Sequence, residues 1–551
     1  MMKLTYKTRL LRLKNIIAIS SVASIALIVI LPSLYIAALV LVNWENIVKV
    51  VFFNPIIGNA YWIDILRYLS LSFRIAITTT IIDLLIGLPL AYFVARKEVK
   101  GRNVVEDIVT LTLVLPTSGF GFAILIAWSG IISSDVVLPV IGVPVLILLA
   151  HVALTLPYVV RTLSATLKSV ERAYEIVSLS LGASPITTFR KVTLPMILPS
   201  IVSSATLALT RSLGETGATM VVAGVQVTAS IAIVKWVFEF KLEPAMLLSS
   251  FLIILSLMLI LPAERLVRTK RFRKISAKEI EHYLFKLERS FPKQLYLLKD
   301  VIPLLLIVAL TMYPLATLLY TVIEYWNKDP YTGKVEGGVI YYLFGPPSYF
   351  EKVLNATATS LIVALISTLV STYISLLATF IIVKFKYGGL LRALLKVPLI
   401  IPTSSLGLSS LLFWGSLGIT KPSVWLTILT HIAFSVPIIV ETTLSTYESV
   451  NLILLEEVSR TLGASPYITL ETITIPLIKR GILAGAILAF AHSLGETGAT
   501  FLVMGRDVTV PVLVVNMVEA LAIPAAMFTA TYLIALSLIL FTIIRFIMRE
   551  K

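Results

Sequence analysis

Cysteine is absent from the 551-residue chain, and charged residues make up only 14% of it. The first absence excludes disulfides, thiolate metal sites and cysteine nucleophiles. The second excludes an ordinary soluble domain, because a soluble chain of this size needs far more charge to cover its surface. Hydrophobic residues make up 58% of the sequence and the mean hydropathy is +0.96, which is typical of a membrane protein.

Long apolar segments dominate what is present. We count twelve runs of roughly 20 or more apolar residues, the length that crosses the hydrocarbon core of a bilayer. The first run follows basic residues, as in a signal peptide, but it is too long for a cleaved apolar region, so we interpret it as a retained helix. We therefore expect an all-α membrane protein with spans near residues 16–42, 70–95, 106–128, 136–160, 195–224, 244–266, 301–323, 354–383, 393–417, 424–444, 475–505 and 524–547.

The 46 basic residues outnumber the 30 acidic ones, which gives a net charge of +16. In a soluble protein this excess would indicate nucleic acid, but here the position of the charges matters more. With twelve spans, the main basic segments all fall on the side of the N-terminus, which the positive-inside rule makes cytoplasmic. We therefore expect a multi-pass protein of the cell membrane with both termini in the cytoplasm and no nucleic-acid partner.

An eight-residue sequence occurs twice in the chain. Ser-Leu-Gly-Glu-Thr-Gly-Ala-Thr spans residues 212–219 and recurs at residues 493–500, 281 positions later. We call these two segments the octapeptides. Leu-Gly-Ala-Ser-Pro recurs at the same spacing, at residues 181–185 and 462–466, and Pro-Thr-Ser recurs at a similar one. A duplication explains these matches.

The duplication predicts the organisation of the chain. Because each copy has six spans, an even number, the two copies run parallel, and a pathway is expected where they meet. The predicted divisions are a first six-helix repeat over residues 1–263, a basic cytoplasmic linker over residues 264–300 that contains a surface helix, and a second six-helix repeat over residues 301–551.

Each repeat has a polar stretch between its fourth and fifth spans. The pattern predicts a short helix, a Gly in a left-handed turn, an Ala-Ser-Pro restart and a second short helix. Ser is the expected N-cap, and Pro occupies the first helical position. Such a pair of helices makes a knob that projects from the cytoplasmic face. The residues of this pattern are Glu175, Gly182, Ala183, Ser184 and Pro195 in the first repeat, and Glu457, Gly463, Ala464, Ser465 and Pro476 in the second.

These stretches resemble the signature loop of the permease subunits of ABC importers that work with an external binding protein. That loop reads Glu-Ala-Ala, three residues, Gly, and later Leu-Pro. In the second repeat Glu457 fills the Glu position, six residues before Gly463. In the first repeat Ile176 stands there and Glu175 is displaced by one. The resemblance covers essentially the whole chain in two copies, and it implies a fused permease with the fold of type I ABC importers.

The same resemblance implies partners. Each loop would insert a coupling helix into a separate ATPase subunit, so we expect two ATPase subunits, an extracytoplasmic binding protein and surrounding membrane lipid. The sequence contains no GxxxxGK followed by Ser or Thr, the Walker A phosphate cradle. We therefore expect no enzyme activity and no cofactor on this chain, with ATP and Mg²⁺ bound by the partner subunits.

The octapeptides are similar to the Leu-Gly-Glu-aromatic-Gly-Ala stretch of permeases for molybdate, tungstate and sulfate, with Thr216 and Thr497 in place of the aromatic residue. This resemblance implies an inorganic oxyanion as cargo. Permeases for iron(III) and thiamine are similarly duplicated, and phosphate permeases carry a related Gly-Glu-Thr. Iron(III), thiamine, phosphate and polyamine therefore stay as alternatives. The alternative class is an ATP-independent secondary transporter, in which Glu215 and Glu496 carry protons.

Ionisable residues at this depth usually face a cavity or each other. Arg211 and Glu215 are four residues apart and share a helix face, as do His492 and Glu496. Two roles stay open for these pairs: a latch, in which Glu pairs with the base one turn before it, and a translocation pathway. The predicted pathway or gate residues are Arg211, Gly214, Glu215, Thr216, His492, Gly495, Glu496 and Thr497, with Pro116, Thr117, Ser118, Pro402, Thr403 and Ser404.

Two further repeated features have simple interpretations. His151 and His431 stand at equivalent positions on apolar helices with no other ligand-type residues at metal spacing nearby, so we predict hydrogen-bonded buried histidines and no metal site. The Pro-Thr-Ser segments predict broken helices that line the pathway, because the backbone groups freed by a break need hydroxyl or water partners.

Overall fold

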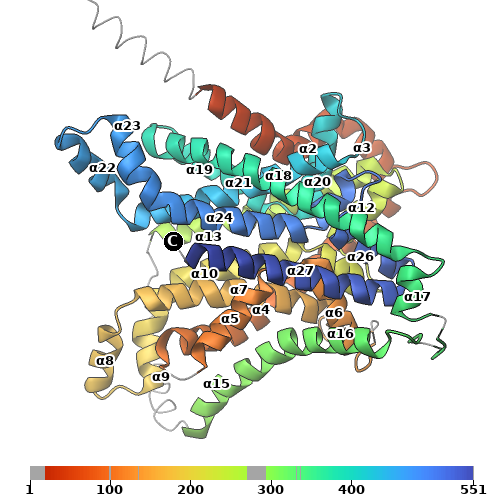
Figure 1. The fold of residues 1–551 in the computed structure, drawn as a ribbon, viewed down its shortest axis with the longest axis horizontal. Helices are drawn as coiled ribbons and strands as arrows, with labels where there is room; N and C mark the ends of the chain where they lie inside the picture. Colours follow the sequence, from red (N-terminus) through yellow and green to blue (C-terminus); the bar gives the residue numbers. More distant parts are fainter. Residues whose placement is uncertain are drawn as a thin grey trace, which may run out of the picture.

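The computed structural model describes residues 19–98, 101–133, 136–269, 293–330, 332–335 and 337–549. Almost all of this is helical (Figure 1). Most of the basic linker, including its predicted surface helix, lies outside the described residues. Within them, ten helices are long and apolar enough to cross a membrane, or twelve if each of two bent helix pairs counts as one span. Each of the twelve predicted spans overlaps one of these, which confirms an all-α membrane protein, although the predicted span 136–160 begins in a short hairpin and the spans 195–224 and 475–505 continue past the ends of helices at Gly214 and Gly495.

The elements of the first half are η1 (Ala26–Ile30), α2 (Leu31–Val42), α3 (Trp44–Val51), α4 (Ala60–Arg96), α5 (Arg102–Thr112), α6 (Thr117–Ser129), β1 (Val137–Leu138), β2 (Val143–Pro144), α7 (Val145–Ser169), α8 (Ala173–Ser180), α9 (Pro185–Thr188), η2 (Phe189–Thr193), α10 (Leu194–Gly214), α11 (Gly217–Val222), α12 (Ala229–Phe238) and α13 (Leu242–Thr269). The strands β1 and β2 form an antiparallel hairpin in which Val137 pairs with Pro144.

The elements of the second half are α15 (Lys293–Ile307), η3 (Val308–Met312), α16 (Tyr313–Glu324), α17 (Val339–Phe344), α18 (Tyr349–Lys384), α19 (Gly388–Ile400), α20 (Thr403–Ser416), α21 (Val424–Ser449), α22 (Leu452–Thr461), α23 (Pro466–Thr469), η4 (Leu470–Thr474), α24 (Ile475–Gly495), α25 (Gly498–Val503), α26 (Val510–Glu519) and α27 (Ile523–Arg549). From α4 and α18 onward the two halves repeat the same order of helices.

The third span of each half is sharply bent. Helices α5 and α6 meet at 111°, and α19 and α20 meet at 110°. Each bend ends at the Pro of a Pro-Thr-Ser segment, since Pro116 and Pro402 are the extended N-caps of α6 and α20. Proline cannot donate a backbone hydrogen bond, so a helix cannot run through it without loss. The predicted breaks at these segments are therefore present in the structure.

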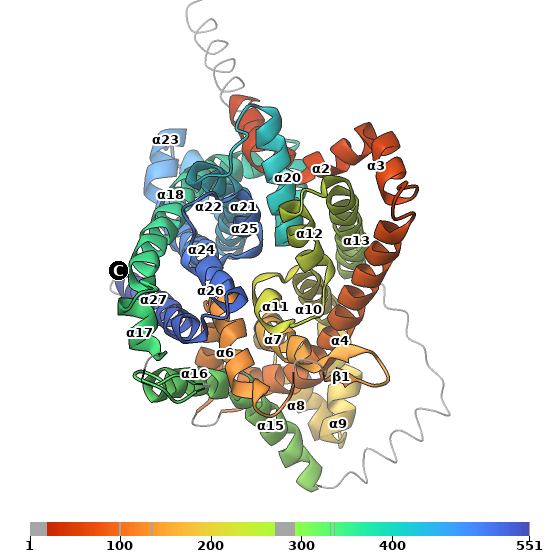
Figure 2. The same cartoon turned by 90° about the vertical axis from the view of Figure 1, so that its right-hand side faces the viewer.

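The two halves are interlocked by their first helices. Helix α2 packs against α20 of the second half, and α16 packs against α6 of the first (Figure 2). The backbone N–H of Ile36 donates to Ser409 Oγ at 3.1 Å, and Tyr313 Oη donates to the carbonyl of Ala127 at 3.3 Å. The division at residues 263 and 301 stays a prediction about sequence repeats. In space, each repeat gives its first helix to the other.

The helix pairs α8–α9 and α22–α23 project from the same end of the molecule, at the left of Figure 1. We call this the loop end. Helices α3 and α17 lie at the other end, which we call the hairpin end because it also carries β1 and β2. One apolar core joins the halves between these ends: Phe120 and Ala218 from the first half belong to the same buried cluster as Leu406 and Leu502 from the second.

Candidate functional site

The two octapeptides form helix breaks inside the core. Helix α10 ends at Gly214, α11 begins at Gly217, and Glu215 between them has an extended backbone with φ −68° and ψ 124°. In the copy, α24 and α25 are interrupted in the same way, and Glu496 has φ −73° and ψ 131°. The identical sequences therefore fold into nearly identical breaks.

A buried glutamate joins the two helices at each break. Glu215 Oε1 accepts a hydrogen bond from the backbone N–H of Ala218 at 3.2 Å, which satisfies one of the free amides at the start of α11. Glu215 Oε2 lies 3.5 Å from Nη2 of Arg211 in the last turn of α10. This arrangement fits the latch role. The equivalent group in the second half consists of Glu496, Ala499 N–H at 3.1 Å and His492 Nε2 at 3.7 Å.

Each octapeptide packs against the Pro-Thr-Ser segment of the other half. A Cβ added at Gly214 would lie 3.0 Å from Cα of Pro402, and one at Gly495 would lie 3.0 Å from Cα of Pro116. Only glycine lets the two backbones come this close without a shift. We call the whole arrangement the seal. It comprises residues 116–118, 212–219, 402–404 and 493–500.

Threonines fill the middle of the seal. A Cβ at Gly217 would lie 2.5 Å from Thr117 Oγ1 and 2.7 Å from Thr497 Oγ1, so no side chain fits there without movement. Since these contacts leave no space between the halves, the seal is closed in this structure. The equivalent set consists of Gly498 with Thr403 Oγ1 at 2.5 Å and Thr216 Oγ1 at 2.8 Å.

A histidine holds both ends of each octapeptide. His151 Nδ1 lies 2.7 Å from Ser212 Oγ, and its Nε2 lies 2.9 Å from Thr219 Oγ1. Thr219 already donates its hydroxyl proton to the carbonyl of Glu215, so it accepts from Nε2–H, and Nδ1 accepts from Ser212. A neutral ring therefore satisfies both hydroxyls. His431 makes the same pair of contacts, with Ser493 at 2.7 Å and Thr500 at 2.9 Å.

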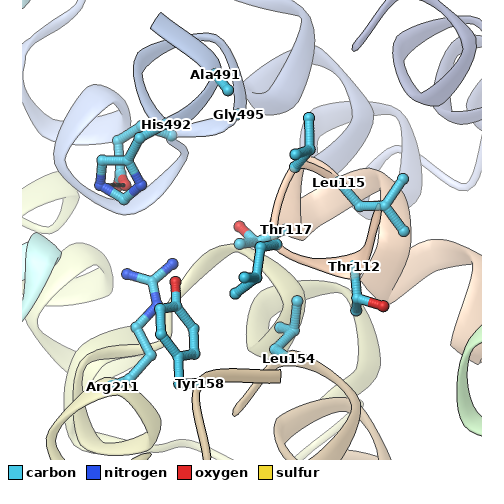
Figure 3. Close-up of a pocket in the computed structure, with 12 residues that line it drawn as sticks. Thr112, Leu115, Thr117, Leu154, Tyr158, Arg211, Ala491, His492 and Gly495 are labelled. Carbon is cyan, nitrogen blue, oxygen red and sulfur yellow. Dashed lines mark ion pairs between the residues drawn. The ribbon is translucent and has the colours of Figure 1, made fainter. Parts of the chain in front are cut away.

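A cavity opens directly beside the seal (Figure 3). Thr112 and Leu115 line it just before Pro116, and Arg211 and His492 line it just before the octapeptide breaks. Helices α5, α10 and α24 all begin at the loop end, so the cavity lies on that side of the seal. A larger cavity of about 550 Å³ shares Leu113 and Val114 with it and extends along α5 and α24.

The two projecting loops have the predicted helix–turn–helix form. Gly182 and Gly463 have φ of +85° and +91°, the left-handed conformation that glycine adopts without strain. Ser184 Oγ accepts from the N–H of Thr187 at 3.1 Å, and Ser465 Oγ accepts from Ile468 at 3.3 Å. Pro195 and Pro476 lie in the first turn of α10 and α24. The exposed tips carry Ala183, Ala464, Leu181 and Leu462. Their role in ATPase coupling stays a prediction.

The structure pairs the glutamates of the two loops differently from the motif spacing. Glu175 accepts from Arg96 Nε at 3.2 Å and from Thr193 Oγ1 at 3.0 Å. In the second loop the equivalent residue is Glu456, which is 4% exposed, whereas Glu457 faces solvent. Glu175 is therefore not displaced from its counterpart. The contacts of Glu456 are Lys384 Nζ and Thr474 Oγ1, the latter at 2.7 Å.

The ion pair with Lys384 lowers the pKa of Glu456. Burial raises the pKa of Glu456, but the hydrogen bonds from Lys384 and Thr474 outweigh burial and lower its pKa below the usual range. Glu456 is thus charged at neutral pH and braces α22 against the end of α18 and the start of α24.

Comparison with known proteins identifies the family of the chain. Residues 87–272 match the family described as binding-protein-dependent transport system inner membrane component. The "probable sulfate transport system permease protein cysT" of Marchantia polymorpha is 30% identical over 220 residues, which cover 38% of this chain and 74% of that relative. The chain belongs to this family of inner-membrane permeases. It is a multi-pass membrane protein about twice as long as a single permease, since 220 residues already make up 74% of this relative.

Two other permeases of the family are similar to the chain. The molybdenum transport system permease protein ModB of Mycobacterium bovis is 35% identical over 161 residues, 28% of this chain and 61% of that relative. The molybdate/tungstate transport system permease protein WtpB of Pyrococcus abyssi is 31% identical over 193 residues, 35% of this chain and 75% of that relative. The permease family accounts for the helical membrane fold.

Sequence reasoning missed three residues that the structure places in these sites. Glu456 stands 281 positions after Glu175, the spacing of the octapeptides, so the repeat spacing contained its signal. Lys384, its partner, is on a distant helix and had no local signal. Tyr158 lines the cavity beside Arg211, and only the three-dimensional arrangement shows it. Ser118 and Ser404 are completely buried in this structure, and their predicted place along the pathway stays a prediction.

Proposed function

We propose that this permease is the membrane-spanning subunit of an ATP-driven importer for an inorganic oxyanion. The observation that carries the proposal is the closed seal, which both halves build together at the interface where a pathway has to cross. A cavity on the loop-end side of the seal contains Arg211, a fixed positive charge. The relatives named for sulfate, molybdenum and molybdate/tungstate support an oxyanion as cargo.

The proposal assigns a side to each end. The loop end faces the cytoplasm, with both termini, because described basic residues such as Arg96, Arg190 and Lys384 lie at that end. An ATPase subunit that binds ATP and Mg²⁺ docks on α8–α9 and another docks on α22–α23. An extracytoplasmic binding protein delivers the anion at the hairpin end. In the present conformation the seal is closed above a cavity on the cytoplasmic side, which corresponds to the inward-facing state.

The mechanism follows from the bracing of the loops. Arg96 and Lys384 join the loops to the ends of α4 and α18, and α9 and α23 continue through η2 and η4 into the helices that end at the seal. When an ATPase subunit moves, the loop bound to it moves as well, and α10 and α24 transmit this movement to the seal as rigid helices. Separation of these two helices parts Gly214 from Pro402 and Gly495 from Pro116, which opens the seal toward the hairpin end.

Uptake in proteoliposomes tests this function. The chain is reconstituted with its ATPase and binding protein, and uptake of labelled sulfate, molybdate and tungstate is compared with that of phosphate and iron(III). We expect ATP-dependent uptake of at least one of the first three. Uptake driven by a pH gradient without ATP would instead indicate a secondary transporter with Glu215 and Glu496 as proton carriers. Exclusive uptake of iron(III) would overturn the oxyanion proposal.

A further inference from the structure

Three polar side chains converge in the cavity below the seal. Arg211 and Tyr158 come from α10 and α7 of the first half, and His492 comes from α24 of the second (Figure 3). The guanidinium and the phenolic oxygen point toward the imidazole across the interface between the halves.

The donors of this group are largely unused. Within the part of the chain that the structure describes, neither Arg211 nor Tyr158 makes a hydrogen bond. The contact of Arg211 with Glu215, at 3.5 Å, is longer than a hydrogen bond. The Arg211 side chain is 21% exposed, to the cavity. Arg211 and Tyr158 are both partly exposed to the same cavity, and the described residues leave their donors unused, which indicates a ligand that accepts hydrogen bonds.

The mirror position in the other half lacks these donors. His151 and His431 stand 280 positions apart, and at this spacing Ile438 is the counterpart of Tyr158 and Phe434 is the counterpart of Leu154. At the octapeptide spacing of 281, His492 is the counterpart of Arg211. Phe434 packs edge-on against His492, with ring centroids 4.8 Å apart. The polar group below the seal is therefore asymmetric, and its donors lie nearer the first half.

Two carboxylates also border this cavity region. Glu496 lines it, and Glu215 lies next to Arg211. Each directs one oxygen to a backbone amide at a helix start, Ala218 or Ala499, which compensates part of its charge. The remaining negative charge weakens the attraction of an anion. A site on a transport pathway has to release what it binds, so moderate affinity suits transit.

We propose that Arg211, Tyr158 and His492 form a single off-axis binding site for a tetrahedral oxyanion, occupied when the seal is closed. This proposal rests on the proposed function and names the residues that meet the cargo. The planar guanidinium donates two N–H groups to two oxygens of the anion. The Tyr158 hydroxyl donates to a third oxygen, and His492 donates from the other half. The anion is thus held at the interface that separates when the seal opens.

Binding of tungstate to the whole transporter tests the site. The complex in nanodiscs, without binding protein, is equilibrated with labelled tungstate, and a cryo-EM map with tungstate locates the heavy atom. We expect density between Arg211 and His492. Tyr158→Phe removes one oxygen that has no partner in the protein, so folding is preserved, and loss of one hydrogen bond weakens binding by about threefold to tenfold. The mirror variant Ile438→Val is the matched control and leaves binding unchanged.

Replacement of the base gives a larger effect. Arg211→His makes the two halves alike at this position, and loss of the bidentate charged contact weakens binding by about tenfold or more. Assembly with the ATPase, measured by co-purification, stays at the wild-type level because His492 shows that histidine fits this place. In uptake, the maximal rate falls while KM, which the binding protein sets, stays constant.

The outcomes separate this inference from the proposed function. If wild-type transporter takes up an oxyanion but tungstate density lies elsewhere, or Tyr158→Phe and Arg211→His bind like the wild type, the site is wrong and the function stands. If no oxyanion is taken up or bound by the wild type, the proposed function itself fails. Density between Arg211 and His492 that disappears in Arg211→His supports both.

Discussion

The two halves agree in the seal and differ below it. His151 and His431 make the same two hydrogen bonds, with distances of 2.7 and 2.9 Å in both halves. In contrast, the position of Arg211 in the first half is occupied by His492 in the second, and the position of Tyr158 is occupied by Ile438. The backbone framework tolerates no divergence because each half packs against the other's glycine. Side chains that face the cavity have no such constraint, so fusion of both halves in one chain lets them diverge and specialise.

The largest effect is expected from the glycines of the seal. Gly217→Ala or Gly498→Ala places a methyl group against two threonines, and overpacking of this kind costs about 1–3 kcal/mol. The closed seal is destabilised, so ATP-driven uptake falls about tenfold or more, as 1.4 kcal/mol corresponds to a factor of ten. The two variants should behave alike. Uptake and passive leak of the anion in proteoliposomes measure this effect.

The matched control for these variants is Gly415→Ala. Gly415 lies near the end of α20 with no atom within 4 Å of an added Cβ. Wild-type uptake is expected. A defect in this control equal to that of Gly217→Ala would show that the seal glycines matter only as helix residues.

The histidines rank next. His151→Ala leaves the hydroxyl of Ser212 without its acceptor in a buried place, which costs about 1–3 kcal/mol. His431→Ala should cost less, because Ser493 Oγ also lies 3.2 Å from Ser367 Oγ and keeps that partner. Both variants should lower the apparent thermal unfolding midpoint of the detergent-solubilised protein, His151→Ala by more. No shift in either variant, or a shift that depends on added metal, would contradict a purely hydrogen-bonding role.

A smaller difference between the halves is expected in the stability of the two projecting loops. Arg96 donates hydrogen bonds to both Glu175 and the carbonyl of Val170, whereas Lys384, among the described residues, bonds Glu456 alone. Arg96→Ala should therefore loosen its loop more than Lys384→Ala, as measured by hydrogen exchange of α8–α9 and α22–α23. Glu457→Gln, which alters an exposed carboxyl beside Glu456, should leave exchange unchanged. Equal exchange in all three variants would show that the ion pairs do not brace the loops.

The smallest effect is a pH dependence of the second loop. Because the folded-state pKa of Glu456 is lowered, its ion pair contributes stability above the ordinary pKa of Glu, and this stability is lost as pH falls through the lowered value. Hydrogen exchange of α22–α23, corrected for intrinsic rates, should rise at acidic pH. Glu456→Gln should abolish the change, and persistence of the change in that variant would assign it to another group.

The sequence predicted the elements whose signals are local and repeated. Twelve apolar runs, the breaks at Pro116 and Pro402 and the turns at Gly182 and Gly463 follow from hydropathy and from backbone limits of proline and glycine. The exchange of first helices between the halves was not predictable, because the apolar residues of α2 and α16 do not indicate which half these helices pack against. The choice of Glu457 over Glu456 was wrong as a structural equivalence, because burial decides it and the motif spacing does not.

Within the candidate site, the sequence identified both octapeptides and both Pro-Thr-Ser segments. The sequence did not show that each octapeptide packs against the Pro-Thr-Ser segment of the other half. Contacts between residues that are far apart in the chain cannot be predicted from a local sequence pattern. The glutamates first suggest reactive groups in the membrane. Their hydrogen bonds to Ala218 and Ala499 join the helices on either side of each break, which fits the latch role, and the asymmetric partner Tyr158 is found only through the cavity.

The lack of cysteine in the chain allows the most direct measurement of the central claim, that the seal is the gate. Thr117 and Thr497 come from opposite halves and both touch the space beside Gly217. In the double variant T117C/T497C, we expect an oxidant to form a disulfide in the nucleotide-free transporter, to abolish uptake, and to form far less when ATP and vanadate trap the other state; reductant restores uptake. Cross-linking that leaves uptake intact, or that is equal in both states, would contradict the account.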